Sequence, residues 1–352
     1  TVALGYAPYL LSGHAGALAD RHSRATVLRW SVLVRAVLTG ILVAAMMSGW
    51  STTAIVALIA ALAVSATPGY PSLASAGVQC VDDADLPTAN ALTTGVENIA
   101  WVLGPGALGA VLLLGFGPAE AVAAAVVLFA VAGLVLLRVV LPLPVSAEDE
   151  TLEGVWPVLR ATVRLPQIRA PMLIAVIDNL LYGFLVVALV LLVAEHGSDR
   201  RLGTLTAALS IGAILSLTVV NHLGRRRATL TLFGLAAVFA GSVMVLGISG
   251  ASPLVVGVLA VGVAGLTTVL IEVLCVTELQ RATPESTHGR VIGMYDVVAV
   301  GGVAAGSLLA GLAAGAVGVQ VATVVTGMGC LVLAAASLAL RHEPRRLIGP
   351  PS

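Results

Sequence analysis

The sequence contains no lysine, and charged residues of every kind are scarce. Only 10% of the 352 residues are Asp, Glu, Lys or Arg, and all 18 basic residues are arginine. A soluble domain carries about 25% charged residues, so this chain has too few to cover a water-exposed surface. The missing lysine excludes a Walker-type phosphate loop and a Schiff-base cofactor site, because both depend on that side chain.

Cysteine and histidine are also too few and too scattered to form a metal site or a disulfide framework. Cys80, Cys275 and Cys330 have no paired spacing, and the six histidines lie in or beside loops. We interpret the cysteines as apolar packing residues. We therefore expect no cofactor, no metal, no nucleic-acid partner and no enzymatic activity.

Long apolar stretches are what the sequence has in abundance. Hydrophobic residues make up 59% of the chain, and the mean hydropathy is +1.04. A membrane-spanning helix needs about 20 mostly apolar residues. The sequence predicts eleven such spans, at residues 1–15, 26–48, 53–77, 89–115, 119–141, 168–193, 202–222, 228–249, 253–277, 289–313 and 318–340. We therefore expect an all-α polytopic membrane protein embedded in the lipid bilayer.

Arginine is concentrated in alternate loops between these spans. Fifteen of the eighteen arginines lie after the first, seventh and ninth runs, in the central segment or in the C-terminal tail. By the positive-inside rule these loops are cytoplasmic. This pattern predicts a cytoplasmic C-terminus in the plasma or inner membrane. The odd number of spans is what the loss of one leading helix would produce.

Two stretches of the first half recur in the second half. Residues 24–28 match 227–231, and residues 102–115 match 299–312 at a similar offset. Parallel halves of six helices around a central loop are typical of one class of transporters. The expected divisions are an N-terminal membrane half at 1–141 (spans two to six), a central cytoplasmic loop at 142–167, a C-terminal membrane half at 168–341 (spans seven to twelve) and a cytoplasmic tail at 342–352.

Residues 16–28, GALADRHSRATVL, resemble the signature loop between the second and third helices of the major facilitator superfamily. The matching positions are Gly16, Leu18, Ala19, Asp20, Arg21 and Arg24. Ser23 departs from the pattern, as is common in the enterobactin-exporter-like branch of drug:proton antiporters. Residues 71–92 and 283–293 are also similar to that branch. The resemblance implies the major facilitator fold and a chain that begins at the family's second helix.

The signature loop has a possible mechanical role. Asp20 is an anion that a helix N-terminus would stabilise. Arg21 and Arg24 could pair with carboxylates across the two halves, and such contacts would hold one conformation and break in another. This is the expected conformational latch, which also includes Gly16. The alternative is that the arginines only fix the orientation in the membrane.

Residues 101–110, WVLGPGALGA, resemble the antiporter signature of the superfamily's fifth helix through Gly104, Pro105 and Gly109. Proline kinks a helix because it removes a backbone hydrogen bond. The resemblance implies export, because importers of the superfamily generally lack this signature. The alternative is ordinary packing through small residues.

Charged side chains within predicted spans are functional candidates, because each costs at least ~2.5 kcal/mol to insert. The candidates for proton coupling or for lining the cavity are Arg35, Glu97, Asp178, Glu272 and Asp296. All but Glu272 lie at depths of roughly 10–16 Å from the cytoplasmic end at 1.5 Å per residue, so they could share one layer.

Asp178 is the first choice for the proton site. It forms a polar cluster with Asn179 and Tyr182 in an otherwise apolar helix. It could bind and release a proton or pair with a cationic substrate. Its alternative role is a static ion pair with Arg35. Glu97 and Asp296 are weaker candidates of the same kind, and Glu272 has the alternative of pairing with Arg281.

The sequence as a whole predicts a secondary active transporter. We expect proton-coupled efflux of a small amphipathic molecule, such as a drug or siderophore-like compound, by alternating access and as a monomer. The alternatives are an importer of the same superfamily and a membrane sensor or scaffold that has lost transport. An intramembrane enzyme would need a nucleophile with its base, or a metal cluster, and the spans contain neither.

Overall fold

The computed structural model is helical throughout the part of the chain that it describes. The described residues are 22–97, 100, 117–139, 166–194, 199–223, 228–250, 254–284 and 287–339. Within these ranges short turns join the helices and no strand occurs. The expected all-α fold is therefore confirmed.

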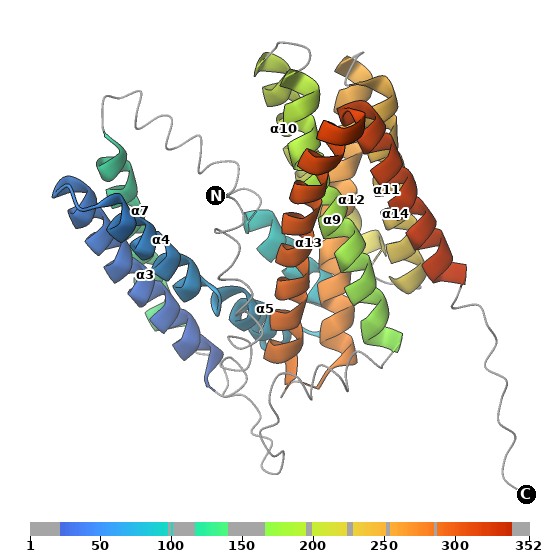
Figure 1. The fold of residues 1–352 in the computed structure, drawn as a ribbon. Coiled ribbons are helices and arrows are strands. Elements are labelled where there is room, and N and C mark those ends of the chain that lie inside the picture. Colours follow the sequence, from blue (N-terminus) through green and yellow to red (C-terminus); the bar gives the residue numbers. More distant parts are fainter. Residues whose placement is uncertain are drawn as a thin grey trace, which may run out of the picture.

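The described helices form two groups (Figure 1). The first group comprises α3 (Arg24–Met47), α4 (Thr52–Ala66), α5 (Gly69–Cys80), the short η2 (Asp83–Asp85), a helix at residues 86–97, and α7 (Pro118–Arg138). The second group comprises α9 (Pro166–Ala194), α10 (Asp199–Leu223), α11 (Ala228–Ser249), α12 (Leu254–Ala282), α13 (His288–Val317) and α14 (Val319–Ala339).

Nine stretches of the described chain are long and apolar enough to cross a membrane, with α4 and α5 counted as one stretch, Thr52–Cys80. They coincide with nine of the eleven predicted spans. The predicted span at 1–15 lies outside the described residues. The predicted span at 89–115 is described only at residue 100 and in its first part, which belongs to the 86–97 helix.

One predicted span is broken in the middle. Residues 53–77 were expected to form a single helix, but α4 ends at Ala66 and α5 begins at Gly69. Pro68 lies between them, and its missing N–H interrupts the helical hydrogen bonds. Thr67 closes the last turn of α4, because its hydroxyl donates to the Val64 carbonyl at 2.8 Å. The break lets α5 leave α4 and contact α12 and α13 (Figure 1).

Local residue choices also set other helix ends. The Ser51 hydroxyl caps α4 by accepting a hydrogen bond from the Ala54 N–H at 3.3 Å. Gly318, with φ +82°, separates α13 from α14. Its N–H donates to the Ala314 carbonyl at 3.0 Å, and glycine adopts this positive φ without the steric penalty of a Cβ.

The helices α9–α14 pack into a bundle with a continuous apolar core. Its fully buried side chains include Leu181 and Phe184 of α9 and Phe239 of α11. The pair α9 and α13 approach each other most closely at small residues. A Cβ on Gly306 would overlap the Leu180 carbonyl oxygen, so only glycine permits this helix contact.

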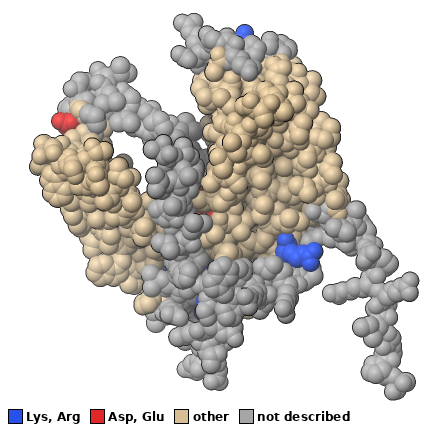
Figure 2. Space-filling model, in the orientation of Figure 1, with Lys and Arg blue, Asp and Glu red and all other residues tan. Residues whose placement is uncertain are grey.

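The outer surface of the described helices is largely apolar. Leucine and valine side chains such as Leu137, Leu312 and Val325 are more than 60% exposed. Figure 2 shows few acidic or basic atoms on the visible face of the described helices. A surface of this kind suits contact with lipid, where charged groups are costly.

The two groups of helices meet through α5 and the 86–97 helix. Helix α3 packs against α4, α5 and α7, whereas α5 also reaches α12 and α13. In Figure 1 the described helices of the two groups diverge from this junction towards the opposite end. The predicted boundaries of the two halves stay predictions, because residues 140–165, which hold most of the predicted central loop, lie outside the described chain.

Candidate functional site

Three carboxyl groups from different helices converge between the two halves. Glu97 ends the described part of the 86–97 helix, Glu272 lies on α12 and Asp296 lies on α13. Glu272 interacts electrostatically with both of the others, and Glu97 interacts with Asp296. All three side chains are partly exposed. We call these three residues the acidic cluster.

Tyr70 of α5 belongs to the same region, although no pattern in the sequence pointed to it. It interacts electrostatically with all three members of the acidic cluster. Tyr295, one residue before Asp296, is 2% exposed and interacts with Tyr70 and Glu272. Figure 2 shows acidic atoms in the middle of the molecule, where the second half faces the first. The region therefore combines carboxyl and phenol groups from both halves.

Asp178, the first choice from the sequence, lies deeper than the acidic cluster. Its side chain is 3% exposed, and it interacts electrostatically with Glu272. The hydroxyl of Thr268 on α12 donates to its Oδ2 at 3.0 Å. Its Oδ1 is buried and has no hydrogen-bond partner among the described residues. Asp178 thus takes its hydrogen bond from Thr268 and not from Arg35.

The other two members of the predicted polar cluster on α9 are half-buried. The Asn179 amide donates to the Ala175 carbonyl of its own helix at 3.0 Å. Tyr182 packs against the apolar core of the second half. Asn179 also lies where α9 and α13 approach each other, since a Cβ on Gly302 would contact its side chain.

Arg35 is engaged within the first half. Its guanidinium lies over the ring of Phe129 on α7, 5.2 Å from the ring centroid. Its Nε donates to the Ser31 carbonyl at 3.3 Å. A cation placed over an aromatic face is stabilised by the ring quadrupole. This geometry gives Arg35 a structural contact between α3 and α7.

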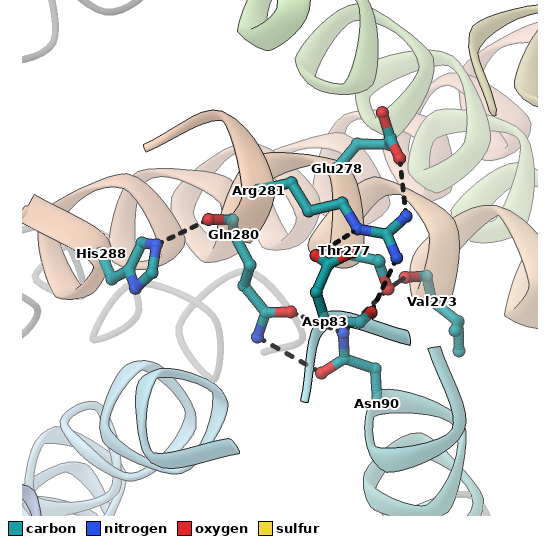
Figure 3. Close-up of polar contacts among 8 residues, drawn as sticks. All are labelled: Asp83, Asn90, Val273, Thr277, Glu278, Gln280, Arg281 and His288. Carbon is teal, nitrogen blue, oxygen red and sulfur yellow. Dashed lines mark hydrogen bonds and ion pairs between the residues drawn. The ribbon is translucent and has the colours of Figure 1, made fainter. Parts of the chain in front are cut away.

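Glu272 does not pair with Arg281, which was its alternative role. The Nε of Arg281 donates to Asp83 Oδ1 at 2.8 Å, and its Nη2 donates to the Asp83 carbonyl at 2.8 Å. Its Nη1 lies 3.4 Å from Glu278, one turn earlier on α12. Arg281 therefore joins α12 to the turn before the 86–97 helix (Figure 3).

Most of the predicted latch and all of the predicted kink lie outside the described residues. This applies to Gly16, Asp20, Arg21, Gly104, Pro105 and Gly109. Arg24 is described, opens α3 and is fully buried. Among the described residues, no group of three or more His, Cys, Asp or Glu side chains could hold a metal ion.

Two groups of described helices long and apolar enough to cross a membrane are the architecture of a multi-pass membrane protein. The protein is a multi-pass membrane transporter of the major facilitator superfamily. Within that class the chain matches the transmembrane secretion effector family over residues 2–346, and it belongs to that family.

Known proteins agree with this assignment. The enterobactin exporter EntS of Citrobacter koseri is 28% identical over 290 residues, which cover 81% of this chain and 68% of EntS. The human organic anion transporter MFSD10 has a similar fold, with a TM-score of 0.77, 16% identity and coverage of 95% of this chain and 81% of that one. The Escherichia coli fucose:proton symporter matches with a TM-score of 0.72, 12% identity and coverage of 97% and 90%.

Proposed function

We propose that the protein exports a small amphipathic molecule in exchange for protons, by alternating access. The observation that carries this proposal is the convergence of Glu97, Glu272 and Asp296 from both halves. Like charges repel, so a proton or a cation placed among these carboxylates is stabilised. A site shared by two halves changes its geometry when they move, which links proton binding to the conformational change.

Export is the direction that two observations favour. The relative EntS is an exporter by name, and residues 101–110 resemble the antiporter signature. An importer of the same superfamily and a membrane sensor without transport are the competing functions. The converging carboxyl groups favour transport over the sensor, because charged groups within spans are costly and persist where they have a function.

The charge of the site favours neutral or cationic substrates over anionic ones. The acidic cluster contributes three carboxyl groups. The intramembrane cation Arg35 lies over Phe129. The potential in a cavity with more carboxyl than basic groups attracts cations and repels anions.

We further propose that the protein acts as a monomer in the inner membrane with its C-terminus in the cytoplasm. The arginines lie in alternate loops, and by the positive-inside rule this supports the orientation. Arg281 and Arg290 lie at the α12–α13 turn, so this end is the cytoplasmic one. Because the halves meet at this end, the arrangement corresponds to a state closed towards the cytoplasm.

Dye transport in energised everted vesicles tests this function. A panel of cationic, neutral and anionic amphipathic dyes is offered to the parent and to Glu97→Gln. The proposal expects uptake of cationic or neutral dyes into the everted vesicles, loss of that uptake with a protonophore, and strong loss in the variant. Transport in the opposite direction would indicate an importer, and no transport of any dye would favour the sensor.

A further inference from the structure

We propose that Asn90, Thr277 and Gln280 form an uncharged lock that holds the two halves together at the α5/α12 end. We call these three residues the amide lock. The inference rests on the proposed alternating-access cycle, because a lock has a role only if this end opens. It concerns residues outside the acidic cluster, and none of them carries a charge.

The amide lock joins segments nearly two hundred residues apart (Figure 3). The Asn90 amide Nδ2 donates to Thr277 Oγ1 at 2.9 Å and to Gln280 Oε1 at 2.7 Å. The Gln280 amide Nε2 donates to the Ala74 carbonyl at 2.8 Å and to Asn90 Oδ1 at 3.3 Å. Both hydrogens of each amide are therefore used.

Two backbone carbonyls fix the direction of these hydrogen bonds. The Thr277 hydroxyl donates to the Val273 carbonyl at 2.7 Å, so its oxygen is left to accept from Asn90. The Ala74 carbonyl can only accept, so the Gln280 nitrogen must point towards it. Turning either amide over would place donor against donor. The geometry thus specifies one arrangement of the closed end.

The amide lock is buried, whereas the neighbouring ion pair is exposed. Asn90, Thr277 and Gln280 are 6%, 0% and 3% exposed. The Asp83 side chain, which pairs with Arg281, is 72% exposed. An exposed ion pair contributes little and is screened by salt, while a buried amide that loses its partner is costly. The lock therefore holds this end more strongly than the ion pair does.

Gln280 is also tied to the start of α13. His288 Nε2 lies 2.7 Å from the Gln280 carbonyl, and because a carbonyl only accepts, this nitrogen carries the hydrogen. The end of α12 and the start of α13 consequently move together with Gln280. On opening, the separated amides meet cytoplasmic water, which replaces their hydrogen bonds. The lock contains no titratable side chain, so protons at the acidic cluster act on it only through movement of the halves.

Backbone hydrogen exchange of the protein in nanodiscs tests the lock without requiring a substrate. The variants are Asn90→Leu, Gln280→Met and the double change, and Gln320→Met is the matched control at an exposed site of α14. We expect each single change to speed exchange in α5 and at the end of α12 by about tenfold, because it leaves one buried amide unpaired. In the double variant the fold-increase in exchange rate should be smaller than the product of the two single increases, since both partners are gone.

The outcomes separate the lock from folding and from the proposed function. Unchanged exchange in α11 and α14 shows that the bundle remains folded, and the control should match the parent throughout. Single effects that simply multiply, or no local change at all, would overturn the lock. If the effects of Asn90→Leu and Gln280→Met on exchange are coupled as expected but the protein transports no dye, the amide lock is supported and the proposed export is not.

Discussion

The close contact between α9 and α13 makes Gly306 a sensitive position for stability. In Gly306→Ala the new Cβ would overlap the Leu180 carbonyl oxygen and lie 2.9 Å from the Phe184 backbone nitrogen. Both obstacles are backbone atoms, so the two helices must move apart. Overpacking of this kind costs about 1–3 kcal/mol, and the upper half of that range applies because no flexible side chain can yield.

Gly311→Ala is the matched control for this substitution. Gly311 lies on the same helix, and a Cβ there would meet no atom within 4 Å. The assay is thermal unfolding of the purified protein in detergent, followed by the fluorescence of a thiol-reactive dye on the buried Cys275 and Cys330. We expect the Tm of Gly306→Ala to fall by roughly 5 °C and that of Gly311→Ala to equal or slightly exceed that of the parent, because alanine is about 0.5–1 kcal/mol more favourable than glycine within a helix. Equal Tm values for the two variants would refute the close packing of α9 on α13.

Three further changes follow from single contacts. Thr268→Val should lower the free energy of unfolding by about 1–3 kcal/mol, since Asp178 loses its hydrogen-bond donor. The control Thr218→Val, at an exposed site, should leave it unchanged, and urea denaturation in mixed micelles compares the two variants. Asp83→Asn should cost less than about 1 kcal/mol, and the difference should vanish in high salt; a large salt-independent loss would contradict this. Ser51→Ala should cost about 1 kcal/mol through loss of the α4 cap, seen as faster local exchange in residues 52–56 alone.

The membrane helices were predictable because each depends on its own composition. A run of apolar residues between polar loops identifies a span without knowledge of its neighbours, and nine predicted spans coincide with described helices. The break at Pro68 was also visible in principle, since proline interrupts helical hydrogen bonds wherever it lies in a helix. The prediction of one helix at 53–77 gave the apolar run more weight than the proline.

The contacts between helices could not be read from the sequence. Counting residues from the cytoplasmic end gives the depth of a charge but not the direction in which its side chain points around the helix. Depth alone therefore allowed an ion pair between Arg35 and Asp178, whereas Arg35 lies over the ring of Phe129 and Asp178 accepts a hydrogen bond from Thr268. Tyr70 was missed for the same reason.

The contacts within the amide lock, between uncharged residues, could not be read from the sequence either. Asn90 and Gln280 are 190 residues apart, and neither stands out in a chain where charge was the main signal. Only the packing of α12 against the first half brings the two amides together. The membrane-length helices were predictable here, whereas the pairing of side chains required the folded chain.

Proton–substrate exchange can be measured in proteoliposomes that contain the purified protein. An outward-directed dye flux is measured with an imposed pH gradient, for the parent, for Glu97→Gln and for Gln320→Met as a control at an exposed site of α14. If protons are coupled at the acidic cluster, the gradient accelerates dye movement in the parent and the control, and Glu97→Gln loses the acceleration. A flux that ignores the pH gradient in the parent, or survives unchanged in Glu97→Gln, would contradict proton coupling at the acidic cluster.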